Sequence, residues 1–236
     1  MTLIAERRER DVLPRFERDG YVVVDELLTS DECTALKTEA LRVRGEHANP
    51  GASVHLGLAA ASPLFHRLAS DPRLVSVLSS ILPRGVMFLS DKLVFKSGAQ
   101  RFATPWHCDA MYWPGTRPKV SVWIPLEDVT AENGTLLVVR GSHRREWQHE
   151  TCARPETNRE FVNFVSERKW DAGDEVVCAL RRGGAVFFSD RLLHASCANE
   201  SGADRYVIIG TYQAPAPDEA FDVAFPARHV IQRREP

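Results

Sequence analysis

The segment GGAVFFSDRLLHAS, residues 183–196, is the part of the sequence that indicates the fold most strongly. Two glycines precede a short apolar run from Ala185 to Phe188, and a polar turn then leads to His194. Short apolar runs bounded by turn residues are typical of β-strands, and a regular succession of them favours a sandwich or barrel. Further runs of this kind lie at 86–95, 120–126, 135–139, 175–179 and 206–212. The sequence therefore predicts a mainly β domain.

The first 85 residues have a mostly helical pattern with one early strand. A helix ends at Gly20, and the apolar run 21–24 forms the strand. Residues 29–32, Thr-Ser-Asp-Glu, fit a capping box that opens a helix to about Arg44, closed by Gly45. The remainder is predicted as a loop over 47–62 and two helices within 63–81 that are divided at Asp71-Pro72.

Length and composition limit the class of protein. The 236 residues predict one domain over 1–236, with a helical part at 1–85, the barrel at 86–213 and a polar insertion at 141–173 that is a candidate lid. The 30 Lys and Arg nearly balance the 32 Asp and Glu, which argues against a nucleic-acid binder. No apolar run reaches the roughly 18 residues of a membrane span, and the N-terminus has no apolar stretch of signal-peptide length. We expect a cytoplasmic enzyme of a small-molecule substrate, without nucleic-acid or membrane partners and of unknown oligomeric state.

His107 and Asp109 are two residues apart in the segment Trp106-His107-Cys108-Asp109. On a strand such residues point to the same face, so the imidazole and the carboxylate can converge on one point. A histidine from a distant strand, such as His194, would complete the 2-His-1-carboxylate triad that binds non-haem Fe(II) and leaves coordination positions open. A His-x-Asp pair alone is a common chance occurrence, so this prediction depends on the rest of the sequence.

Arg205 comes shortly after His194 and opens the last predicted strand of the barrel. A guanidinium that faces a barrel interior requires an anion, because an unpaired buried charge is strongly unfavourable. Arginine also binds a carboxylate through two N–H groups at once. An arginine near a metal site therefore indicates a dicarboxylic co-substrate, with one end on the metal and the other on Arg205.

Together these motifs resemble the phytanoyl-CoA dioxygenase family of Fe(II)/2-oxoglutarate-dependent oxygenases. The resemblance extends from Phe16 to Tyr212 and rests on blocks that keep their order and spacing. The blocks are 105–110 (PWHCDA), 122–130 (VWIPLEDVT), 132–136 (ENGTL), 141–143 (GSH), His194 with Ser196, and Arg205. The family fold is a double-stranded β-helix, a jelly-roll or cupin-like barrel with helices packed outside. This agrees with the pattern of helices followed by strands.

The resemblance also implies roles for individual residues. Those that would bind Fe(II) are His107, Asp109 and His194. Arg205 would pair with the far carboxylate of 2-oxoglutarate, Ser196 would assist it, and Trp123 would pack beside this co-substrate. The implied reaction consumes O2, releases succinate and CO2, and hydroxylates an unactivated C–H bond of a small metabolite. Related halogenases have a small residue in place of the aspartate, so Asp109 argues against halogenation.

Two positions depart from the usual pattern of the family. Cys108 stands between the predicted ligands where glutamine is common, and Arg140 stands before the Gly-Ser-His block where proline is common. Neither departure replaces a predicted iron ligand or Arg205. The contacts beside the metal are therefore the part of the site that the resemblance leaves open.

Lys92, Tyr112, Trp113 and Arg101 are four further candidates for binding. Lys92 and Lys96 share a parity on the strand before the metal motif, so one or both could face the barrel mouth, and Lys92 is the candidate second anion contact. Tyr112, Trp113 and Arg101 flank the metal motif in predicted loops and are candidates for the substrate pocket.

Two other functions remain open. One is a non-oxidative metalloenzyme on the same barrel, such as an isomerase or hydrolase, and the other is a catalytically silent binding module. Neither requires Arg205 together with the ordered His-x-Asp and distant histidine. The identity of the substrate, and hydroxylation as opposed to desaturation, are not determined by these motifs.

Overall fold

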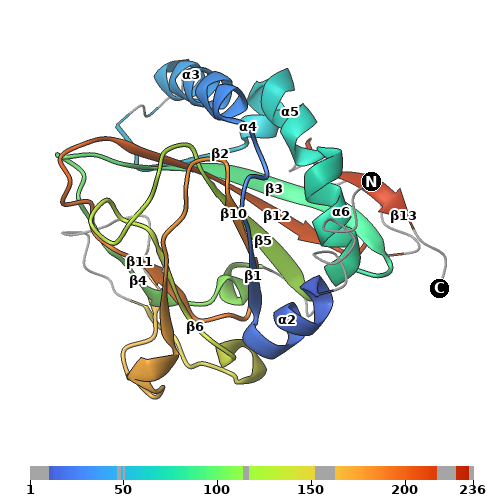
Figure 1. The fold of residues 1–236 in the computed structure, drawn as a ribbon, viewed down its shortest axis with the longest axis vertical. Helices are drawn as coiled ribbons and strands as arrows, with labels where there is room; N and C mark the ends of the chain where they lie inside the picture. The colour runs from blue at the N-terminus through green and yellow to red at the C-terminus, as the bar shows by residue number, and fades with distance from the viewer. Residues whose placement is uncertain are drawn as a thin grey trace.

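Two antiparallel β-sheets packed face to face form the centre of the structure, a computed structural model that describes residues 11–46, 49, 51–113, 117–151, 163–216 and 227–233 (Figure 1). The larger sheet has the strand order β1-β10-β5-β12-β3-β13, and β2 also pairs with β3. Its strands are β1 (Tyr21–Val24), β2 (Val54–Leu56), β3 (Gly85–Lys96), β5 (Lys119–Pro125), β10 (Ala185–Ser189), β12 (Arg205–Gln213) and β13 (His229–Arg233). The smaller sheet, of order β4-β11-β6-β9, contains β4 (Thr104–His107), β6 (Leu136–Val139), β9 (Glu175–Cys178) and β11 (His194–Ser196). This confirms the predicted jelly-roll barrel.

An apolar core fills the space between the two sheets. Val94, Trp123 and Val207 of the large sheet pack there with Leu136 and Val138 of the small sheet. Because side chains alternate along a strand, every second residue of β3 and β12 faces this interior. The interior positions that matter for the site are Lys92, Val94 and Lys96 on β3, and Arg205, Val207 and Ile209 on β12.

Helices cover the outer face of the large sheet, on the side away from β4, β6 and β11 (Figure 1). The α-helices in the described residues are α2 (Val12–Asp19), α3 (Ser30–Glu46), α4 (Leu58–Ala61), α5 (Pro63–Ala69) and α6 (Pro72–Ile81). Leu36, Phe65 and Leu74 from these helices belong to one core with Phe88 and Leu93 of β3. The large sheet is thus buried on both faces, which explains why its strands are such continuous apolar runs.

The predicted capping box is confirmed at the start of α3. The Thr29 amide donates to the Glu32 carboxylate (2.7 Å), and the Glu32 amide donates to the Thr29 hydroxyl (3.2 Å). The predicted stop at Gly45 is wrong, because α3 continues to Glu46. Arg42 forms an ion pair with Glu46 one turn away, which stabilises the last turn across the glycine.

The loop predicted over 47–62 is also wrong, since its second half contains β2 and α4. The β2 strand forms because it pairs with β3, and the Asp91 carboxylate of β3 accepts a hydrogen bond from the Ala59 amide in α4 (2.9 Å). The prediction of two helices divided at Asp71-Pro72 is confirmed, with the Asp71 side chain capping α6 by accepting from the Arg73 amide.

Gly20 ends α2 and fits closely against the loop that precedes His194. Its φ is +84°, and its amide donates to the Phe16 carbonyl (2.8 Å). A Cβ at this position would lie 2.4 Å from Nδ1 of His143 and 2.6 Å from a methyl group of Leu192. Glycine is therefore required here by both the backbone conformation and the contact. This supports a structural role for the Gly-Ser-His block.

The described parts of the candidate lid pack on the outer face of the small sheet. They contain η2 (Ser142–Arg144), β7 (Glu150–Thr151), β8 (Asn163–Phe164) and η3 (Ala172–Asp174). The Val165 amide donates to the Trp106 carbonyl of β4 (2.7 Å), and the Trp170 ring packs edge-on against Trp106 at 5.3 Å. The rest of this prediction, at 152–162, lies outside the described residues. Over the described ranges, no helix has the length and apolarity that a bilayer span needs.

Candidate metal centre

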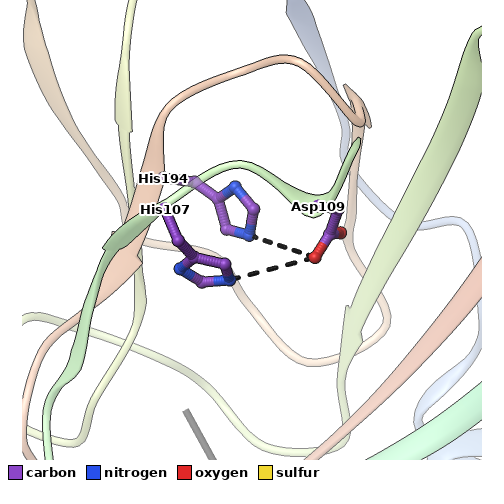
Figure 2. Close-up of side chains that lie close together, drawn as sticks. All are labelled: His107, Asp109 and His194. Carbon is purple, nitrogen blue, oxygen red and sulfur yellow. Dashed lines mark ion pairs between the residues drawn. The ribbon is translucent and has the colours of Figure 1, made fainter. Parts of the chain in front are cut away.

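His107 and His194 lie side by side because the strands that carry them pair with each other. His107 is the last residue of β4 and His194 is the first of β11, and the antiparallel register places them opposite each other. Both side chains are buried, and their ring centroids are 4.2 Å apart. Figure 2 shows a ring nitrogen of each directed toward Asp109.

Asp109 completes the cluster through a turn of the chain. One of its carboxylate oxygens, Oδ1, lies 3.8 Å from Nε2 of His107 and 3.9 Å from Nε2 of His194. The expectation that His107 and Asp109 share one face of a strand is wrong, because β4 ends at His107 and Asp109 begins the 3-10 helix η1 (Asp109–Tyr112). The Ala110 amide donates to the Asp190 carbonyl (2.8 Å) and fixes this turn.

The backbone orients both imidazoles. Nδ1 of His107 donates to the Pro105 carbonyl (2.8 Å), and Nδ1 of His194 donates to the Leu192 carbonyl (2.9 Å). A carbonyl oxygen only accepts hydrogen bonds, so Nδ1 carries the hydrogen in each ring. The lone pair of Nε2 therefore faces the carboxylate, as a metal ligand requires.

The surroundings favour the ionisation states of metal ligands. Burial lowers the pKa of both His107 and His194, so both imidazoles are neutral near pH 7. Burial alone would raise the pKa of Asp109, but the positive charge of Lys92 and a hydrogen bond from Ser121 (2.8 Å) help to hold it below its usual value. The cluster thus offers two neutral nitrogens and one anionic oxygen.

This donor set fits non-haem iron. The three ligand atoms lie within 4.8 Å of one another, and the part of the chain that the structure describes holds no second cluster of this kind. Two imidazoles and one carboxylate leave coordination positions open, whereas structural zinc sites are closed by four protein ligands.

Arg205 lies in the same cavity as the cluster and is buried without a carboxylate partner among the described residues. Its Nη2 donates to the Gly134 carbonyl (3.0 Å), Nη1 donates to the Val94 carbonyl (3.5 Å), and Nε has no partner. The guanidinium carbon is 5.9 Å from the centroid of the Trp123 ring. Burial lowers the pKa of Arg205 to about 10, so the group is charged near pH 7. The charged guanidinium thus keeps an unpaired Nε, and the anion that would pair with it stays a prediction.

Lys96 is a second buried basic residue beside Arg205, and the sequence assigned it no role. The two residues pair in the β3–β12 register, and Lys96 is fully buried. Its Nζ donates to the Ser196 hydroxyl (2.8 Å) and to the Cys197 carbonyl (2.5 Å). Burial and the charge of Arg205 lower the pKa of Lys96 to about 6. In the sequence, Lys92 and Lys96 could be seen only to face the same side of their strand. The β3–β12 register shows that Lys96 is the lysine that lies beside Arg205.

Ser196 lies between these cations and the small sheet. It accepts a hydrogen bond from Lys96, and its own hydroxyl donates to the Thr104 hydroxyl (2.8 Å). In this arrangement the Ser196 hydroxyl positions the ammonium of Lys96.

Cys108 points to the other side of the small sheet. Its thiol donates to the Arg191 carbonyl (3.3 Å), and its side chain belongs to an apolar cluster with Val139, Val165 and Leu193. Burial raises the pKa of this thiol. These contacts give Cys108 a packing role behind the metal cluster.

Most of the predicted site residues line one cavity between the sheets. Tyr112 lies near it, exposed, with its ring centroid 6.2 Å from that of His107. Trp113 follows η1, and Arg101 forms a surface ion pair with Glu200. Neither lines the cavity in the described residues, so both stay predictions. The predicted residues that do line it are Lys92, His107, Asp109, Trp123, His194, Ser196 and Arg205.

Known proteins resemble this chain over most of its length. Residues 16–207 match the family described as Phytanoyl-CoA dioxygenase (PhyH). The ectoine dioxygenase of Sphingopyxis alaskensis is 25% identical over 251 residues, which cover 93% of this chain and 81% of the relative. The L-proline trans-4-hydroxylase of Streptomyces griseoviridis is 28% identical over 230 residues, which cover 86% and 85%.

A solved structure shares the fold. The epimerase SnoN from nogalamycin biosynthesis, in complex with Fe3+, alpha ketoglutarate and nogalamycin RO, superposes with a TM-score of 0.72. The identity is 20%, and the match covers 92% of this chain and 93% of that chain.

The family match includes β4, η1 and β11, which carry His107, Asp109 and His194, and the structure brings these three side chains together. The chain belongs to the phytanoyl-CoA dioxygenase (PhyH) family of non-haem dioxygenases, whose cofactors are iron and 2-oxoglutarate.

Proposed function

We propose that the chain hydroxylates an unactivated C–H bond of a small metabolite, using Fe(II), 2-oxoglutarate and O2 and releasing succinate and CO2. One observation carries this proposal: a single cavity joins three metal-ligating side chains to the buried Arg205. A diacid that chelates a metal through one end and meets a guanidinium at the other requires both features. A non-oxidative metalloenzyme, or a silent binding module, would leave the buried cations Arg205 and Lys96 without a function.

The proposed iron ligands are Nε2 of His107, Nε2 of His194 and a carboxylate oxygen of Asp109. Their support comes from contacts already made in the protein. The histidine Nδ1 atoms are held by backbone carbonyls, and Ser121 holds the second oxygen of Asp109. Such preorganisation keeps the ligand atoms aimed at one point before the metal arrives.

The proposed partner of the far carboxylate of 2-oxoglutarate is the pair Arg205 and Lys96, with Ser196 holding Lys96 and Trp123 packing beside the co-substrate. The charge of Arg205 and burial disfavour the ammonium form of Lys96, and an anion bound between the two residues would pair with Arg205 and favour that form.

When bound, iron and 2-oxoglutarate supply the oxidising chemistry. The contribution of the chain is to hold one substrate C–H bond in place and to exclude water. The apolar lining of the cavity, Val94, Leu136, Phe188 and Ile209, serves the second purpose.

The two named relatives support an oxidation of a small metabolite, since one is an ectoine dioxygenase and the other an L-proline trans-4-hydroxylase. SnoN is an epimerase on the same fold, so the product has to be identified and not only the release of succinate.

Anaerobic titration with Fe(II) and 2-oxoglutarate tests the proposal. We expect uptake of one iron per chain and the weak visible absorption of the metal–oxoacid chelate, followed by succinate formation when O2 is admitted. With its substrate, the protein should yield a product that contains one added oxygen atom.

His107→Ala should abolish the chelate absorption and succinate formation together. His66→Gln, in α5 on the far side of the large sheet, is the matched control and should change neither. A wild-type protein that binds iron but gives no 2-oxoglutarate chelate would overturn the proposal.

A further inference from the structure

We infer that the substrate carries an anionic group that Lys92 binds at the open end of the metal cavity. This inference rests on the proposed function and adds the substrate class to it. It does not follow from the iron ligands or from Arg205, and it has a separate test.

The position of Lys92 is fixed by strand pairing. On β3 it lies opposite Leu56 of β2 on one side and opposite Ile209 of β12 on the other, and Ile209 pairs in turn with Trp123 of β5. Paired residues face the same side of a sheet, so this row faces the cavity, and Lys92 lines it together with all three metal-ligating side chains.

Lys92 has no anion of its own. Asp109 is the one carboxylate that lines the cavity in the described residues, and it lies beyond ion-pair distance of Lys92 while still responding to its charge. Bound iron would use this carboxylate as a ligand. The ammonium of Lys92 would then face the cavity without a counter-charge.

In the loaded cavity, the positive charge of Lys92 is not balanced by the other charges. Iron(II), the Asp109 carboxylate and the 2-oxoglutarate dianion together carry a single negative charge. Arg205 alone balances it, even if Lys96 is neutral. Lys92 therefore adds at least one unbalanced positive charge beside the reaction centre, and a protonated Lys96 would add a second. A substrate with a negative group is the complement of this excess.

The two lysines of β3 differ in a way that separates co-substrate from substrate. Lys96 is fully buried beside Arg205 and does not itself line the cavity. Lys92 is half-buried, and its cross-strand neighbour Leu56 is 68% exposed. Lys92 is therefore the lysine of the cavity lining that solvent, and an entering substrate, can reach.

The next row on the same face of the sheet carries hydroxyl groups, although its residues do not line the cavity itself. Ser90, Thr211 and Ser121 pair across β3, β12 and β5, and the Ser121 hydroxyl reaches Asp109. Hydroxyl groups close to an ammonium suit a small polar acid better than a long hydrocarbon chain.

Saturation-transfer NMR on the protein loaded with 2-oxoglutarate and with Zn(II) in place of iron tests this inference without turnover. The probes are small carboxylic acids, each paired with its primary amide, together with a sulfonate and a phosphate monoester of similar size. We expect the wild type to bind acids more tightly than their amides by about tenfold or more, as for a charge-assisted hydrogen bond. The preferred anion then shows whether the group is a carboxylate, sulfonate or phosphate.

Lys92→Met should remove this preference, and Lys92→Glu should reverse it. The matched control is Lys169→Met, which removes an exposed lysine paired with Glu167 and should keep the preference. Equal binding of acids and amides by the wild type, or no binding of any acid, would overturn the inference.

A further outcome separates substrate from co-substrate. In the anaerobic Fe(II)-loaded protein, Lys92→Met should keep the 2-oxoglutarate chelate absorption, with an affinity within about threefold of the wild type. If 2-oxoglutarate binding falls as far as in Arg205→Met, Lys92 binds the co-substrate and the inference is wrong. If the wild type forms no chelate at all, the proposed function itself fails.

Discussion

The two ends of the cavity are built in opposite ways. At the metal end, His107, His194 and Asp109 are each fixed by a hydrogen bond to the protein, and their charges suit a cation. At the other end, Arg205 and Lys96 are buried next to each other, and no carboxylate of the described residues lies within ion-pair distance of either. The metal end therefore has all of its ligand atoms oriented by the protein, while the other end has no anion to pair with its basic residues.

Under the proposed function, this difference separates the interactions that the protein supplies from those that the co-substrate would supply. A buried guanidinium without an anionic partner, here Arg205, is unfavourable for folding, so the surrounding core must stabilise it until an anion binds. An anion that binds there gains the full interaction because the cations are already desolvated and positioned. The predictions below separate the two ends.

The largest effect is expected at the metal end. Asp109→Ala removes the anionic ligand and should abolish succinate formation, with a loss of iron affinity well beyond the roughly 10–100-fold typical of outer-shell changes. Iron content after desalting and succinate formation under O2 measure both.

The control for this variant is Ser121→Ala, which removes only the hydrogen bond to Asp109. It should weaken iron binding by at most about 10–100-fold and keep measurable activity. An Asp109→Ala protein that keeps its iron and its activity would exclude Asp109 as a ligand.

The second effect separates the two ends. Arg205→Met fills a similar volume without a charge, and we expect 2-oxoglutarate binding to weaken about thirtyfold or more while iron binding is unchanged. Calorimetric titration of the metal-loaded protein measures the first quantity, and metal titration of the free protein measures the second. Equal loss of both would contradict the role assigned to Arg205.

The smallest effect concerns the protonation of Lys96. Burial and Arg205 lower the pKa of Lys96 to about 6, so in the free protein the amine is largely neutral at pH 8. A bound dianion favours the ammonium form and raises this pKa. Binding should therefore take up as much as one proton at pH 8, and 2-oxoglutarate affinity should fall as the pH rises above about 6, by at most about tenfold per pH unit.

Calorimetry of the metal-loaded protein in two buffers of different ionisation enthalpy measures this proton uptake. Loading with metal removes the titration of His107 and His194 from the comparison. Lys96→Met should bind 2-oxoglutarate without the uptake. The same uptake in the wild type and in this variant would show that another group takes the proton.

The large elements of the fold were predictable because they depend on local sequence. The apolar runs that became β3 and β12, and the reciprocal bonds of Thr29 and Glu32, are visible in the sequence itself. β2 and α4 were missed because each depends on β3, through strand pairing or through the Asp91 cap. The strand β13 was missed for a similar reason, since it pairs with the far end of β3.

The candidate site was likewise predictable only where it depends on local sequence. His107, Asp109 and His194 were found from their spacing and surroundings, although the path by which Asp109 reaches the histidines was predicted wrongly. Their alternation suggested a strand, whereas the chain turns into η1 after Cys108. Lys96 was not assigned because the sequence gives parity along one strand but not the register with the next.

The most direct measurement is an anaerobic crystal structure of the protein with Fe(II) and 2-oxoglutarate. We predict iron bound by His107, Asp109 and His194, and the far carboxylate of 2-oxoglutarate in contact with Arg205 and Lys96. Iron at another position, or a far carboxylate that contacts neither cation, would contradict the account.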